Sequence, residues 1–166
     1  VFLCTVIIVQ SQTRPEREKF NFNADWRMAI GDRAGNELLY DDDKDWQKVT
    51  LPRAFNENDA FKKSIAELTT GIVWYRKYFK VPKGTSGKKV FIEFEGIRFA
   101  GEFYINGKWI GRSENGIMAF GFDITNAIKY DSVNVLAAKI DNSWNYKEIA
   151  TQSGFQWNER NFMWTM

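Results

Sequence analysis

Three segments in the middle of the chain alternate between apolar and polar residues, and this pattern constrains the fold more than any other feature. They span residues 71–82, 90–96 and 101–111. In the first segment, Tyr75 and every second residue around it point to one face, while Trp74 and its alternate neighbours point to the other. A period of two residues is typical of β-strands. We therefore predict that the middle of the chain is β-sheet.

Turn residues separate these segments. Asn106-Gly107 lies between two aromatic-rich runs, which is the strongest short-range signal for a β-hairpin. Gly96 and Gly101 flank a short connection in which we expect a side chain to collide with its surroundings. Serial short strands with turns between them favour an all-β sandwich or jelly roll, and one such domain suits a chain of 166 residues.

The composition excludes several classes of function. Histidine is absent, which removes Ser-His-Asp and Cys-His catalysis and every histidine metal site. Cys4 is the only cysteine in the sequence, so no intramolecular disulfide forms. A net charge of +2 without a basic stripe argues against nucleic acid as a partner. We expect no cofactor and no metal. The seven tryptophans fit a large aromatic core, and one or two of them fit stacking on sugar rings.

The N-terminal region differs from the rest of the chain. Residues 1–9 are apolar but too few for a membrane span, and polar residues follow them. We interpret residues 1–12 as the remnant of a secretory signal peptide, 13–21 as a linker and 22–166 as the β-sandwich domain. The location predicted from this interpretation is periplasmic or secreted. The alternative is that residues 1–9 form a buried strand.

Short motifs run through the chain in a fixed order, at residues 45–52, 74–82, 88–96, 102–111, 120–125 and 134–142. In this order they resemble the N-terminal sugar-binding domain of glycoside hydrolase family 2, which includes β-galactosidases, β-glucuronidases and β-mannosidases. The resemblance runs from about Phe22 to Asn142. It departs from the family pattern after Pro52, where residues 53–55 replace a histidine and an aspartate.

The resemblance implies a jelly-roll β-sandwich of the galactose-binding-domain type, with its closing strand beyond the chain. It also implies that the chain is the non-catalytic N-terminal domain of a retaining, β-galactosidase-like hydrolase. In that family an immunoglobulin-like domain and a (β/α)8 barrel follow, and the barrel holds both catalytic glutamates. The expected partners are these domains and a carbohydrate substrate. The alternatives are a stand-alone carbohydrate-binding module and a structural adhesion sandwich.

Glu93 and Glu95 do not fit the chemistry of a retaining glycosidase, which needs two carboxyl groups roughly 5 Å apart across the scissile bond. They lie two residues apart on one predicted strand, and such residues are about 7 Å from each other. We interpret them as a solvated face of the sheet and expect no catalytic residue in the chain.

Candidate sugar-binding residues gather in the C-terminal part of the chain. The resemblance implies that the loop before the closing strand faces the active site of the barrel. The substrate-binding residues that we predict are Asp141, Asn142, Trp144, Trp157, Asn158 and Asn161. The alternatives are turn formation by Asp141 and Asn142, and packing of Trp157 against another domain. Asn58 and Asp59 are weaker candidates, for which we favour a turn.

Further expectations concern local structure. We expect a first strand at 20–30 and short helices at 61–68 and 126–130. The acidic run 41–43 lacks the spacing of a calcium-binding loop, so we predict a solvated loop there. The side chains expected in the core are Trp26, Trp46, Tyr75, Phe94 and Phe103.

Overall fold

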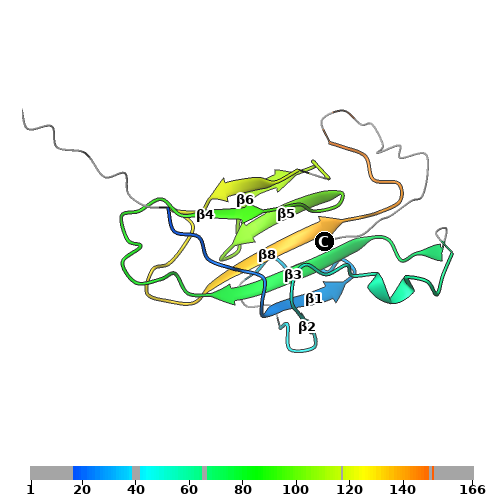
Figure 1. Cartoon of the computed structure of the whole chain (residues 1–166), viewed down its shortest axis with the longest axis horizontal. Coiled ribbons are helices and arrows are strands. Elements are labelled where there is room, and N and C mark those ends of the chain that lie inside the picture. Colours follow the sequence, from blue (N-terminus) through cyan, green and yellow to red (C-terminus); the bar gives the residue numbers. More distant parts are fainter. Residues whose placement is uncertain (1–16, 39–41, 65–66, 117, 150, 152–166) are drawn as a thin grey trace, which may run out of the picture.

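The chain folds into two antiparallel sheets. The computed structural model describes residues 17–38, 42–64, 67–116, 118–149 and 151. The larger sheet has the order β2-β1-β3-β8-β5-β6, and Figure 1 shows β1, β3, β8 and β5 side by side. Its strands are β1 (Trp26–Ile30), β2 (Gln47–Val49), β3 (Ile72–Phe79), β5 (Ala100–Ile105), β6 (Lys108–Ser113) and β8 (Asn134–Asp141). The smaller sheet pairs β4 (Phe91–Phe94) with β7 (Phe120–Asp123).

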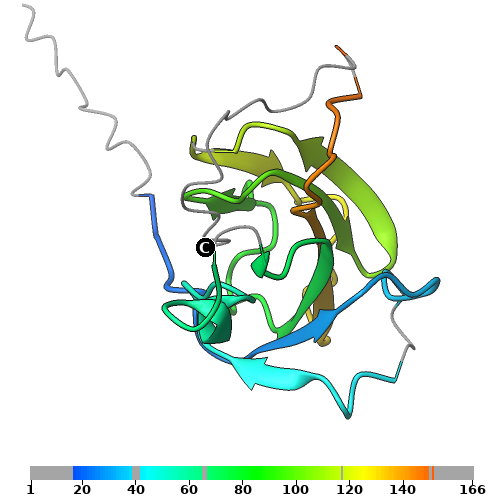
Figure 2. The same cartoon turned by 90° about the vertical axis from the view of Figure 1, so that its right-hand side faces the viewer.

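The two sheets pack face to face around an aromatic core. Phe103 of β5 is completely buried, and its ring centroid lies 4.5 Å from that of Phe94 on β4 and 5.2 Å from that of Phe122 on β7. Figure 2 shows how the larger sheet curves from β2 and β1 round to β6. The predicted all-β sandwich is therefore confirmed, with a two-stranded second sheet in the described part of the chain.

Most of the side chains expected in this core lie there. Trp26, Tyr75 and Phe103 are buried in it, and Phe94 packs against it while partly exposed. Trp46 is also buried, as predicted, but it packs in a second hydrophobic cluster with Trp74 and Ala137.

The second cluster lies on the outer face of the larger sheet, because Trp74 alternates with core-facing Tyr75 along β3. Arg76, also completely buried, lies on this outer face with its guanidinium 4.7 Å from the ring centroid of Trp46. Arg76 Nη2 donates hydrogen bonds to the carbonyl oxygens of Asn36 at 2.6 Å and Leu38 at 3.3 Å. The β1–β2 connection therefore folds over the outer face of the sheet.

The β5–β6 hairpin confirms the turn predicted at Asn106-Gly107. Both residues have positive φ, 52° and 79°, as a two-residue hairpin turn requires. The side chain of Asn106 also forms hydrogen bonds with the backbone of two other segments of the same chain. Its Nδ2 donates to Ala127 O at 2.9 Å, and its Oδ1 accepts from Val135 N at 3.0 Å. The turn is thus fixed to β8 as well as being favoured locally.

The first strand begins later than expected. Asp25 has a φ of 57°, which breaks the extended conformation, so β1 starts at Trp26 rather than at residue 20. Phe22 still packs on the core side, with its ring centroid 5.9 Å from that of Trp26. Residues 1–16, which include the predicted signal-peptide remnant and part of the predicted linker, lie outside the described residues.

The helix expected at 61–68 does not begin at Phe61, although Glu67 within this range has 3-10 conformation. Phe61 has a φ of 61° and is fully exposed, so it cannot begin an apolar helical face. Residues 61 and 62 form a turn instead, in which Asp59 O accepts from Lys62 N at 3.0 Å. A 3-10 helix of this connection, η1, lies earlier, at Glu57–Asp59.

The helix expected at 126–130 is also wrong, because the chain makes only one turn there. Ala127 N and Ile128 N both donate to Ile124 O, at 2.9 and 3.2 Å. The side chain of Asn134 then forms two hydrogen bonds with the backbone of Lys129. Its Oδ1 accepts from Lys129 N and its Nδ2 donates to Lys129 O, each at 2.7 Å. These bonds direct the chain into β8 before a helix can continue.

Gly111 on β6 offers a test of the packing between the sheets. A Cβ atom there would overlap the ring of Phe122, so we expect Gly111→Ala to lower the free energy of unfolding by about 1–3 kcal/mol. Gly101 is similarly crowded, as predicted, with Ile97 Cδ1 2.5 Å from a built Cβ. Gly96 is not, since nothing lies within 4 Å, which corrects our expectation. Gly96→Ala is therefore the control. Equal urea midpoints for Gly111→Ala and Gly96→Ala would contradict this packing.

No helix among the described residues is long and apolar enough to cross a membrane.

Candidate functional site

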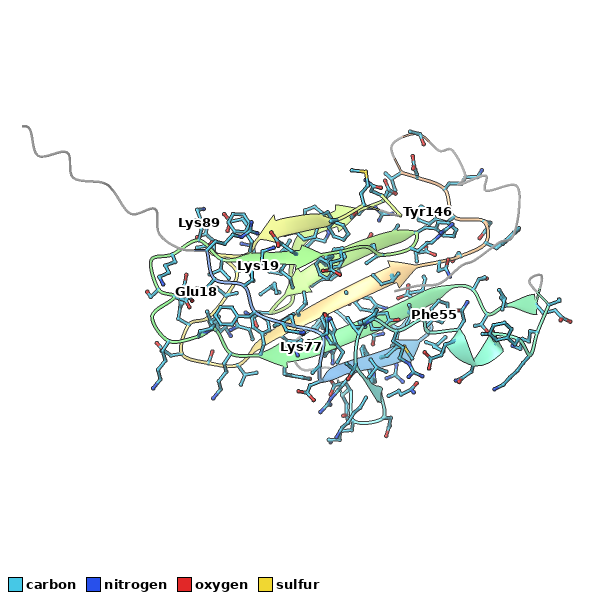
Figure 3. The ribbon with its side chains drawn as sticks, in the orientation of Figure 1. Glu18, Lys19, Phe55, Lys77, Lys89 and Tyr146 are labelled. Carbon is cyan, nitrogen blue, oxygen red and sulfur yellow. The ribbon has the colours of Figure 1, made fainter. Side chains whose placement is uncertain are left out.

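Two connections meet at the end of the larger sheet where β8 finishes and β3 begins. Asn142 N donates to Gly71 O at 2.9 Å, and Gly71 N donates to Asn142 O at 3.3 Å. This pair places the β2–β3 connection beside the β8 loop, which we define as residues 142–149. In Figure 3, Tyr146 of the β8 loop and Phe55 of the connection lie toward one end of the molecule, and Lys89 lies toward the other. This end holds the candidate site.

Asp141 and Asn142, both predicted to bind substrate, occupy the point where β8 passes into its loop. Asp141 Oδ1 accepts a hydrogen bond from Ser143 N at 2.8 Å, which is a turn contact. Asn142 is completely buried, and neither its Oδ1 nor its Nδ2 has a hydrogen-bond partner among the described residues. Leaving a buried amide without hydrogen bonds costs about 1–3 kcal/mol of folding free energy. Both the donor and the acceptor of the Asn142 amide are therefore available at this end of the sheet.

Trp144 is the aromatic member of the predicted set that the structure describes. It follows the Asp141–Ser143 turn, and the residue is 56% exposed. An exposed ring beside polar groups has the chemistry needed to stack on a sugar. The other predicted residues, Trp157, Asn158 and Asn161, lie outside the described residues.

Glu114 binds the β8 loop to the end of β6, and this contact was not predicted. Its Oε1 accepts hydrogen bonds from Ile149 N and from Arg112 Nη2, each at 3.0 Å, and from the hydroxyl of Tyr146. Burial and donation to Glu114 raise the pKa of Tyr146 to about 12. Arg112 also pairs with Glu102 of β5. The network therefore joins two strands of the sheet to the loop.

The β2–β3 connection is organised by Asp59. Its Oδ2 accepts from Thr69 N at 2.7 Å, and its Oδ1 lies 3.0 Å from Lys63 Nζ. Asn56 Nδ2 donates to Thr69 O at 3.1 Å, so the start and end of the connection are tied together. These contacts favour the turn interpretation of Asp59. Asn58 beside it is exposed.

Asp59 should make the stability of the fold sensitive to acid. Hydrogen bonds from the hydroxyl and N–H of Thr69, and then from Lys63, lower the pKa of Asp59 from 3.8 to about 2. Because the folded-state pKa is the lower one, this stabilisation is complete above pH 3.8 and is lost as the pH falls toward 2. We expect Asp59→Asn to flatten the dependence of Tm on pH in this window. If the slope of Tm against pH is unchanged in Asp59→Asn, Asp59 is not the source of the acid-sensitive stabilisation.

Glu93 and Glu95 behave as expected of a solvated sheet face. Both are exposed, and Glu93 forms ion pairs with Arg17 and, at 3.7 Å, with Lys19. In the described parts of the chain, no group of three or more acidic, cysteine or histidine side chains is placed to hold a metal ion.

Asp43 corrects the prediction of a solvated acidic run. It is buried, forms an ion pair with Arg27, and lies 3.5 Å from Arg76 Nη1, while the hydroxyl of Tyr78 donates to it at 2.7 Å. Asp42 next to it is exposed, as predicted. Asp43 is therefore a buried counterion of Arg76 on the outer face of the sheet.

The two-sheet architecture and the loops at one end of it define a galactose-binding-like β-sandwich domain. The chain belongs to the family described as "Glycosyl hydrolase 2 galactose-binding domain-like", whose model matches residues 52–165. It thus matches the N-terminal domain of family 2 glycoside hydrolases.

Known relatives are much longer than this chain. A β-glucuronidase of Formosa agariphila is 37% identical over 137 residues, which cover 78% of this chain and 14% of the relative. The β-galactosidase BoGH2A of Bacteroides ovatus is 36% identical over 133 residues, covering 76% of this chain and 16% of that protein. The structure of a β-glucuronidase from glycoside hydrolase family 2 superposes with a TM-score of 0.70 at 37% identity, over 74% of this chain and 14% of that one.

Proposed function

We propose that this chain is the sugar-binding N-terminal domain of a retaining glycosidase, which hydrolyses terminal β-galactosides or β-glucuronides. In this proposal the domain supports a catalytic barrel and lends the β8 loop to the rim of its substrate pocket. The catalytic carboxylates lie in the barrel.

The observation that carries this proposal is the match in sequence and fold to hydrolases of which the chain makes up a small share. The identity to the Formosa agariphila enzyme is 37%, but the chain spans only 14% of that enzyme. The exposed position of Glu93 and its ion pairs with Arg17 and Lys19 add support, because they fit a solvated sheet face rather than an active site.

The residues at the end of β8 support a role at the rim. Asp141 Oδ2 has no hydrogen-bond partner among the described residues, and the buried amide of Asn142 has none there either. Trp144 adds an exposed ring. A carboxylate, an amide and an aromatic ring are the groups with which proteins bind sugar hydroxyls and the C–H faces of sugar rings. We propose that Trp157, Asn158 and Asn161 extend the same rim.

The nature of the sugar can be tested with two aryl glycosides. Relatives of similar identity are named for both sugars, a β-glucuronidase at 37% and a β-galactosidase at 36%. We expect the polypeptide that joins this chain to a barrel to hydrolyse p-nitrophenyl β-D-galactoside or p-nitrophenyl β-D-glucuronide, with one value of kcat/KM clearly larger. Hydrolysis of neither substrate, together with galactose or glucuronate binding to the isolated chain in calorimetry, would favour a stand-alone carbohydrate-binding module.

A further inference from the structure

The β8 loop is fixed near both ends by hydrogen bonds. At its start, Asp141 Oδ1 accepts from Ser143 N at 2.8 Å. At its far end, Ile149 N donates to Glu114 Oε1 at 3.0 Å. Trp144, which is 56% exposed, lies between these two anchors. The exposed ring is thus carried by a short segment whose backbone is held on either side.

One oxygen of Glu114 provides the second anchor. Its Oε1 accepts hydrogen bonds from Ile149 N and from the hydroxyl of Tyr146, so two residues of the loop share it. Both bonds end on a carboxylate, and such charge-assisted bonds are roughly twice as strong as neutral ones. Figure 3 shows Tyr146 beside the carboxyl end of β8, where this contact forms.

The anchor is itself held by the sheet. Arg112 Nη2 donates to Glu114 at 3.0 Å, and Arg112 Nη1 pairs with Glu102, its cross-strand neighbour on β5. Burial alone would raise the pKa of Glu114. Hydrogen bonds from Tyr146, from the N–H of Ile149 and from Arg112 instead hold this pKa below its usual value. The carboxylate is therefore ionised at neutral pH and ready to accept all three bonds.

We infer that Glu114 is a positioning residue, which sets the place of Trp144 at the rim by holding the β8 loop against β6. This inference rests on the proposed function, because Trp144 needs a sugar to stack on. Glu114 itself touches no sugar. Its effect is to limit the conformations of the loop before substrate arrives, so that less ordering is needed on binding.

The test compares Glu114→Ala with two matched variants in the polypeptide that contains the barrel. Glu102→Gln removes the charge of the other carboxylate on Arg112 but keeps an Oε1 acceptor for it and leaves every contact of the loop in place. Glu114→Gln likewise keeps an Oε1 acceptor. We expect Glu114→Ala to speed deuterium exchange in a peptide covering 143–149 about tenfold or more. We expect it to raise KM for the better aryl glycoside about three- to tenfold, with kcat changed less than about twofold. Glu114→Gln should fall between Glu114→Ala and the wild type, and Glu102→Gln should match the wild type in exchange.

Each other result counts against the inference in a distinct way. Unchanged exchange in Glu114→Ala would show that Glu114 does not hold the loop. Faster exchange with an unchanged KM would contradict both the positioning role of Glu114 and the placement of Trp144 at the rim. It would not contradict the proposed glycosidase activity. A lower kcat with an unchanged KM would indicate a purely structural role, because a smaller folded fraction lowers kcat alone. If the wild type hydrolyses neither aryl glycoside, the proposed function fails and the positioning of Trp144 fails with it, while exchange still decides whether Glu114 holds the loop.

Discussion

Asp43→Ala is expected to lower the free energy of unfolding by about 3–5 kcal/mol, because it removes a buried carboxylate that pairs with the buried guanidinium of Arg76. The variant also removes the acceptor of the Tyr78 hydroxyl and an ion pair with Arg27. Loss of this magnitude consumes a large share of the stability of an ordinary domain. Urea denaturation followed by tryptophan fluorescence measures it.

The control is the neighbouring carboxylate. Asp42 is exposed and pairs only with its near neighbour Lys44 in the described structure, so Asp42→Ala should leave the urea midpoint unchanged. A second variant separates charge from packing. Arg76→Met paired with Asp43→Leu removes both charges together and should recover much of the lost stability, because no buried charge remains unpaired. If Asp43→Ala proves as stable as Asp42→Ala, Asp43 is not the counterion that holds the β1–β2 connection on the sheet.

Asp141→Ala is expected to lower kcat/KM of the barrel-containing enzyme about five- to a hundredfold. One hydrogen bond to a substrate hydroxyl is worth on the order of 1 kcal/mol when neutral and about 3 kcal/mol when charged. The structure adds a competing role, because Asp141 Oδ1 also forms the turn to Ser143 N. Both kcat/KM and Tm must therefore be measured on the same purified variant.

Asp141→Asn separates the two roles. The amide keeps an Oδ1 acceptor for the turn to Ser143, so its Tm should stay at the wild-type value. Its kcat/KM should still fall, because the charged bond becomes a neutral one. If Asp141 only forms a turn, Asp141→Ala will lower Tm while the folded enzyme keeps its wild-type kcat/KM.

The parts of the fold that the sequence predicted well depend on local patterns. The alternation along β3 placed Tyr75 and Trp74 on opposite faces, and the structure buries them in different clusters. The hairpin at Asn106-Gly107 followed from backbone conformations that these residues favour. In both cases the signal lies within a few residues of the feature that it specifies.

The parts that were missed depend on contacts between distant segments. Asp43 looks like part of a solvated acidic run until β3 brings Arg76 beside it. Glu102 faces Arg112 only because the register shifts by one residue between Phe103 and Tyr104, and an unbroken hairpin register would have placed Gly111 there instead. No pattern in the sequence marks that shift, so the network that anchors the β8 loop could not be predicted.

The candidate site was predicted by position more than by geometry. The resemblance placed Asp141 and Asn142 at the end of a strand, and the structure confirms that position. The burial of Asn142 was not foreseen, because it depends on the Gly71 backbone that pairs with it across the sheet end. Their role in binding a sugar stays a prediction.

The proposal that catalysis belongs to a barrel and not to this domain is tested by comparing the 166-residue chain alone with the polypeptide that adds a barrel. Hydrolysis of p-nitrophenyl β-D-galactoside and p-nitrophenyl β-D-glucuronide is measured for both. We predict no turnover by the chain alone and efficient turnover once the barrel is present, because the domain supplies support and rim contacts but no catalytic pair. Robust turnover by the pure chain, abolished by Glu93→Gln or Glu95→Gln, would contradict it.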